Sequence, residues 1–96
     1  MRKEIIEESE NERMRQISIE GWSLGHDDGH KNNELAIAAS GYCNVQIDSM
    51  DKYLVPDNWP FDEDWFKPST PRRNLIKAAA LIVAEIERID RQEIII

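Results

Sequence analysis

Long hydrophobic runs are missing from this sequence of 96 residues. No apolar stretch approaches the roughly 20 residues that a helix needs to span a bilayer. The first ten residues, MRKEIIEESE, turn acidic where a secretory signal peptide would need an apolar stretch. We therefore expect a protein that does not enter a membrane and that stays in the cytoplasm of its host cell.

The sequence contains a single cysteine, Cys43. One cysteine cannot form a disulfide within the chain, and a metal site would need ligands other than thiolates. We expect Cys43 to be a buried and inert thiol.

An excess of positive charge is also missing, because the net charge is -7. This argues against general nucleic-acid binding, which depends on Lys and Arg side chains that neutralise phosphates. The charges are unevenly distributed: residues 21–66 carry a net charge of -7 and residues 67–96 one of +2. The basic segment contains Lys67, Arg72, Arg73 and Lys77 without an intervening acid. The acidic centre and this basic segment can pair with each other.

The composition that remains is that of one small globular domain. Hydrophobic residues make up 41% of the chain and charged residues 32%, which is too apolar for a disordered chain and too charged for a membrane protein. We expect a single domain over residues 1–96 with one hydrophobic core. The predicted fold is mainly α, with about three helices and a long loop rich in Trp and Pro between the second helix and the last.

Two helices are expected in the first half of the chain. Residues Arg2–Glu20 favour helix and contain no Gly or Pro, and Gly21 provides the break. Within this helix, residues 1–11 are rich in Glu and are expected to form a frayed extension. The second helix should begin at residues 32–33, two asparagines suited to the N-cap, and continue to Tyr42.

The last helix has the clearest sequence signals. Thr70 is a natural N-cap, and Pro71 suits the first helical position. Its apolar residues recur at helical spacing as one stripe: Leu75, Ala78, Ala79, Ile82, Ile86 and Ile89. We expect this stripe to be buried against the helix that contains Leu35 and Ala39.

Residues 44–70 are expected to be mostly loop, with a brief helix or strand near residues 46–55. At the other end of the last helix, Ile94–Ile96 would be unusual in water. We expect these isoleucines to dock, and the long apolar stripe in so short a chain predicts a homo-oligomer, most simply a dimer.

The order of motifs over residues 12–91 resembles a widespread group of small phage and prophage proteins. The motifs are ERMRQISIEGWSLGHDDGHKNNELAIAASGY, WPFDEDWFKP and RRNLIKAAALIVAEIERIDR. A subset, GWSLGHDD with a following Lys and the later RRNLIKA, is also similar to the repeat domain named after ryanodine receptors. The positions that match this repeat are Gly21, Trp22, Gly25, Asp27, Asp28, Lys31, Arg73 and Asn74. The repeat has a shorter connection than residues 32–70. The resemblance implies a phage accessory protein that binds a small ligand of nucleotide type.

A metal site is one interpretation of the segment HDDGH. His26, Asp27 and His30, with Glu34 one helical turn further on, are the ligand types that bind zinc and other divalent ions. A hydrolytic site of the HD type would need more than the two histidines of this chain. We favour turn-forming and capping aspartates beside a hydrogen-bonded or exposed histidine, and hence no metal.

The two arginines of the basic segment occupy the first turn of the last helix, where the helix dipole disfavours cations. Something must offset that cost. Carboxylates can do so, from residues 62–64 or from Asp27 and Asp28. A bound anion could also offset this cost, held by the N–H groups of the helix start together with Arg72, Arg73 and Lys67. We favour carboxylates as the groups that offset the cost of these cations, and we keep a bound anion as the functional hypothesis.

The three tryptophans lie in turn-rich segments, where large aromatics usually close a small core. A second interpretation sets Trp22 or Trp65 beside the arginines as a surface on which a base stacks. No Gly-rich phosphate loop or nucleophile motif supports an enzyme.

The resulting hypothesis is a non-enzymatic phage accessory protein that binds a small anionic ligand or a host protein. Two alternatives are a metal-dependent phosphohydrolase that uses the HDDGH segment and a purely structural interaction module. The candidate ligand-binding residues are Trp22, Asp27, Asp28, Trp65, Lys67, Arg72 and Arg73.

Overall fold

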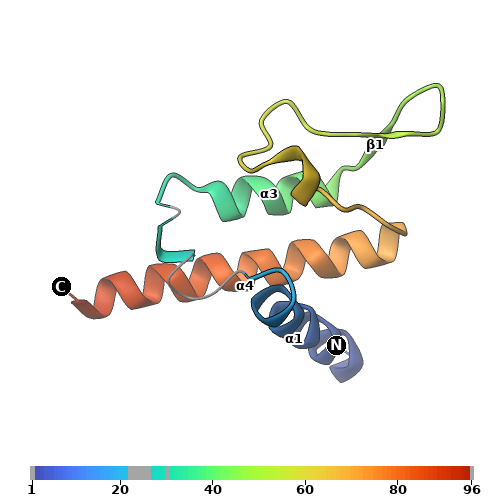
Figure 1. Cartoon of the computed structure of the whole chain (residues 1–96). Coiled ribbons are helices and arrows are strands. Elements are labelled where there is room, and N and C mark those ends of the chain that lie inside the picture. Colours follow the sequence, from blue (N-terminus) through green and yellow to red (C-terminus); the bar gives the residue numbers. More distant parts are fainter. Residues whose placement is uncertain (1, 22–26, 30, 96) are drawn as a thin grey trace.

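A computed structural model describes residues 2–21, 27–29 and 31–95, and its side chains as far as residue 92. Helices dominate this part of the chain, which confirms the mainly α class. They are α1 (Lys3–Ser18), α3 (Glu34–Cys43) and α4 (Pro71–Ile95). Figure 1 shows α3 lying along α4, whereas α1 lies across α4 at a steep angle. Both shorter helices therefore pack on the longest one. Within the described ranges, none of the helices has the length and apolar character that a membrane span requires.

The start of α4 follows from local capping chemistry. Pro71 is its first residue, and the Thr70 hydroxyl accepts a hydrogen bond of 3.2 Å from the backbone N–H of Arg73. That bond satisfies one of the N–H groups that a helix start leaves without a partner. The predicted cap and first position are therefore confirmed.

Asn33 holds the N-cap position of α3 in the left-handed region, with φ 65°, and its side chain makes no capping bond. The predicted start at residues 32–33 is nevertheless correct. Gly21, with φ 76°, follows the end of α1. A glycine adopts this conformation without steric cost, and so the predicted break after the first helix is confirmed.

A small β-hairpin follows α3. Strands β1 (Gln46–Ile47) and β2 (Tyr53–Leu54) pair antiparallel, so the brief helix or strand expected near residues 46–55 is a pair of strands. In the turn between them, the Asp48 carboxylate accepts hydrogen bonds from the backbone N–H groups of Met50 and Lys52. An aspartate that bonds its own turn in this way fixes the hairpin locally. The chain then passes through a single 3-10 turn, η1 (Glu63–Trp65), to α4.

Aromatic side chains from the loop close the core. Phe66 is buried, with its ring 4.9 Å from that of Trp59 and 5.2 Å from that of Tyr42. Phe61 lies between Trp59 and Trp65, at 5.8 Å from each ring. Trp59 and Trp65 are partly buried and pack against the core cluster, in line with the simpler interpretation. Trp22 lies outside the described residues.

The face that α4 buries differs from the predicted one. Leu75, Ile82 and Ile86 are 55%, 46% and 53% exposed, and Ile89 is exposed as well. Of the predicted stripe, only Ala78 is fully buried. The core residues of α3 and α4 are Leu35, Ala38, Ala39, Tyr42, Ile76, Ala78, Ala80, Leu81 and Ala84. The expected packing of α4 on α3 is correct, but the predicted buried stripe is wrong. The alanines of α3 let the two helices approach closely, and that contact favours the small residues of α4 over its isoleucines.

Helix α1 packs on the rest of the domain through polar side chains. Its buried residues are Glu12, Arg13 and Gln16, while Ile6 and Met14 are more than half exposed. Residues 2–7 are all exposed. The attachment of α1 to α4 thus depends on ion pairs and hydrogen bonds.

Candidate functional site

The two arginines at the start of α4 face carboxylates of α1. Both terminal nitrogens of Arg72 donate to Glu8, at 2.7 and 2.8 Å. Arg73 donates to Glu12, which is buried. Carboxylates therefore offset the cost of cations at this helix start, as the simpler interpretation held, but the residues named for that role were wrong. Asp62, for example, accepts a hydrogen bond from the backbone N–H of Asp64 in its own turn.

Glu12 is the centre of this network. The Arg15 guanidinium forms two hydrogen bonds to its carboxylate, at 2.8 and 2.9 Å, and the Gln16 amide forms one at 3.2 Å. Burial raises the pKa of Glu12, but the hydrogen bonds and charges of Arg15, with the charge of Arg73 and the bond from Gln16, outweigh burial and lower it below 4.5. Glu12 thus stays ionised inside a small protein.

The two lysines of the basic segment are engaged in the same region. Lys67 donates to both carboxylate oxygens of Glu20, at 3.2 and 2.9 Å, and lowers the pKa of Glu20. Lys77 donates to the Lys67 carbonyl oxygen and lies 5.7 Å from the centre of the Tyr42 ring. Burial lowers the pKa of the Lys77 ammonium. The space enclosed by these groups measures about 10 Å³, enough for about one water molecule. It has no room for a nucleotide.

The aspartates of the HDDGH segment hold the fold together. Asp27 is fully buried and pairs with Arg13 of α1. Asp28 accepts two hydrogen bonds from Arg91 near the end of α4, at 3.0 and 2.7 Å. The Glu34 carboxylate accepts a bond from the backbone N–H of Asn32.

The metal interpretation named His26, Asp27, His30 and Glu34 as ligands. His26 and His30 lie outside the described residues. Among the residues that the structure does describe, no cluster of three potential ligands is present. Asp27 and Glu34 make the contacts given above, which are structural.

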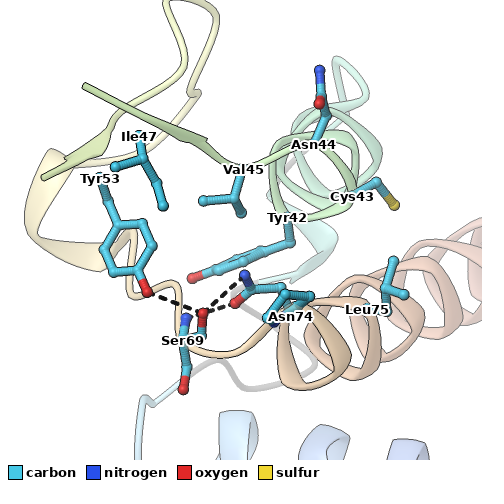
Figure 2. A pocket seen from close by; sticks show the side chains of 10 residues that line it. Tyr42, Cys43, Asn44, Val45, Ile47, Tyr53, Ser69, Asn74 and Leu75 are labelled. Carbon is cyan, nitrogen blue, oxygen red and sulfur yellow. Dashed lines mark hydrogen bonds between the residues drawn. The ribbon is translucent and has the colours of Figure 1, made fainter. Parts of the chain in front are cut away.

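A pocket of about 280 Å³ opens between the hairpin and the start of α4. Figure 2 shows Val45, Ile47 and Tyr53 on the hairpin side, with Tyr42 and Leu75 among the other lining residues. The volume lies slightly below the range of about 300–1,000 Å³ that is typical of small-molecule sites.

The polar edge of this pocket is held in place by hydrogen bonds. The Ser69 carbonyl oxygen accepts from the Tyr53 hydroxyl at 3.1 Å and from the Asn74 amide at 3.3 Å, drawn as dashed lines in Figure 2. Cys43 also lines the pocket and is exposed, so the expectation of a buried thiol is wrong. The reason is its position as the last residue of α3, where the neighbouring Tyr42 turns inward instead.

Beside the pocket begins a stripe of apolar side chains that we term the α4 outer face. Its large aliphatic members are 40–55% exposed, and Ala79 is half-buried. The residues of the α4 outer face are Leu75, Ala79, Ile82, Val83, Ile86 and Ile89. Leu75 belongs both to this face and to the pocket. Sequence reasoning found most of these residues but assigned them to the core.

Comparisons with known proteins give no relative: no protein-family model, no curated protein and no solved structure matches this chain.

Proposed function

We propose that this protein is a non-enzymatic interaction module that binds another protein chain through the α4 outer face. One observation carries the proposal. The longest helix exposes five large aliphatic side chains in one continuous stripe, although the core is built on the opposite side of the same helix. A contiguous exposed apolar stripe of this kind is typical of a protein-binding surface.

The pocket beside Leu75 supports the same function. Binding energy at protein interfaces concentrates on a few side chains that enter preformed pockets. The pocket is walled by apolar groups and has a hydrogen-bonded edge, so an apolar side chain of the partner would fit it. The α4 outer face would then align the rest of the partner.

A small anionic ligand is the weaker candidate. That hypothesis began from cations at a helix start without compensation, and Glu8 and Glu12 now supply the compensation. The hydrolase alternative depends on Asp27 as a ligand, and Arg13 engages that carboxylate. The resemblance to small phage proteins gives the proposed setting, which is a phage accessory protein in the host cytoplasm that binds a host protein or a second copy of itself.

Site-specific photo-crosslinking in cells tests the proposal. A benzophenone amino acid replaces Ile82 in one variant and Met50 in the control, because Met50 is an exposed apolar residue of the hairpin turn, away from α4. We expect adducts of one or a few defined masses from position 82 and none of these from position 50. Addition of Ile86→Glu to the first variant should remove them. Adducts that are equally abundant from both positions, or absent from position 82, would contradict the proposal.

A further inference from the structure

The α4 outer face has the spacing of a helix-pairing seam. Its central line runs through Leu75, Ala79, Ile82, Ile86 and Ile89, with steps of four, three, four and three residues. This is the a/d pattern of coiled coils, in which apolar residues keep facing a partner helix. The stripe extends for about 21 Å along the axis. The occupant that fits such a seam is another α-helix.

The stripe is also nearly symmetric about its middle. Leu75 and Ile89 each lie seven residues from Ile82, and both are exposed. A two-fold dimer needs a patch that is complementary to its own copy. When two α4 helices are placed antiparallel with their stripes centred, the Leu75 end of one copy meets the Ile89 end of the other.

The exposed charges on one flank of the stripe favour this antiparallel orientation. Arg72 lies one turn before the stripe, with its side chain 58% exposed, whereas Glu87 and Asp90 lie at its far end. In the antiparallel arrangement, Arg72 of each copy comes within about one helical turn of Asp90 of the other. A parallel arrangement sets like charges level with each other, and it also aligns the two helix dipoles unfavourably.

We propose that the partner of the α4 outer face is a second copy of this chain, and that the two α4 helices pair antiparallel about Ile82. This inference rests on the proposed function and names its partner. The arrangement covers the apolar stripe of both copies at once and brings the partner's Ile89 to the Leu75 end of the stripe, beside the pocket. Two heptads form a short interface, so we expect a dissociation constant in the roughly micromolar range.

Sedimentation equilibrium over about 5–500 µM provides the first test. We expect the wild-type chain to be dimeric at the upper end of this range. Ile82→Glu and Ile86→Glu should each weaken association at least about tenfold, because a carboxylate would be buried in the interface. Met50→Glu adds the same charge at an exposed apolar residue outside the stripe and should leave association unchanged. Circular dichroism should show equal helix content in all four proteins, since the substituted residues are exposed.

The orientation is tested by a distance between spin labels. Gln92→Cys is labelled in a Cys43→Ser background, so that each chain carries one label and Arg72, Glu87 and Asp90 are kept. Residue 92 lies ten residues from the centre of the stripe, and an antiparallel pair therefore separates the two labels by about 30 Å along the axis. A parallel pair would bring the labels side by side. A short distance would overturn the antiparallel proposal.

Three further results would overturn the second copy as the partner. They are a wild-type monomer at about 500 µM, an association that neither Glu substitution weakens, and a dimer that Met50→Glu disrupts. Photo-crosslinks from position 82 to a different protein would in that case preserve the proposed function. If the crosslinks were missing as well, the proposed function would fail together with this inference.

Discussion

Leu81 occupies the buried side of α4, in the cluster that includes Leu35 and Ala38 of α3. Because Leu81 has no exposed surface, Leu81→Ala should lower the free energy of unfolding by about 2–5 kcal/mol through lost burial and a residual cavity. Leu54→Ala is the matched control, since Leu54 is 47% exposed in the hairpin and should contribute about 1 kcal/mol or less. Urea unfolding of both variants measures the difference. Equal losses would place Leu81 outside the core.

Asp27 and Asp28 are adjacent acids in very different environments. Asp27 is fully buried against Arg13, whereas the side chain of Asp28 is 46% exposed in its pair with Arg91. Asp27→Asn removes one charge of a buried pair and should cost about 3–5 kcal/mol. Asp28→Asn should cost at most about 1 kcal/mol, because an exposed ion pair contributes little. Chemical denaturation compares the two variants. If Asp28→Asn proved the more damaging, the assignment of these two roles would be reversed.

At the scale of the elements, α1 is attached through carboxylates. Arg73 bridges α4 to the buried Glu12, so Arg73→Ala should lower the melting temperature in the absence of any ligand. Arg72→Ala removes the more exposed pair with Glu8 and serves as the control, with little expected loss.

The same two proteins test the anionic-ligand hypothesis. Because Glu12 satisfies Arg73, no nucleotide or cyclic nucleotide should raise the melting temperature of the wild type. A nucleotide that did so, with the shift lost in Arg73→Ala, would restore that hypothesis.

The attachment of α1 should also depend on pH. Hydrogen bonds from Arg72 and Lys67 lower the pKa values of Glu8 and Glu20, and the pKa of Glu12 lies below 4.5 despite its burial. A carboxylate with a lowered pKa in the folded state stabilises the fold above its unfolded pKa, near 4.5. That stabilisation is lost as the pH falls through the folded pKa. We therefore expect the wild type to be more stable than Glu12→Gln at pH 7, and the difference to shrink below about pH 4.5. A difference independent of pH would show that Glu12 acts through packing alone.

Local signals along the chain were sufficient to predict the elements but not their partners. Thr70 and Pro71 identified the start of α4, because a cap depends on residues three positions apart. The pair between Arg73 and Glu12 joins residues 61 positions apart. The sequence indicates only that the partner of Arg73 is an acidic residue, and several acidic residues of the chain fit that description equally well.

The buried face of α4 was predicted wrongly for a physical reason. The search for a core stripe favours the largest aliphatic residues, and on α4 these are the isoleucines. The actual core side carries alanines together with Glu85 and Arg88, which pair with each other and are both nearly buried. A hydropathy pattern assigns charged residues to the surface. Two charged residues that pair with each other can nevertheless be buried on the core side of a helix, and the pattern then misses that side. The four-three spacing of the isoleucines is present in the sequence, and the proposed helical partner rests on it.

For the whole molecule, the two sides of α4 should respond differently to concentration. Loss of a core residue such as Leu81 acts within one chain, whereas in the proposed dimer the α4 outer face contributes only when a second copy covers it. Since association stabilises the folded state by mass action, the melting temperature of the wild type should rise by a few degrees between about 5 and 500 µM. Ile82→Glu should show a smaller rise over this range, because its association is weaker, and Leu81→Ala should melt lower but keep the concentration dependence. A wild type whose melting temperature does not change with concentration would show that its own copies leave the outer face uncovered.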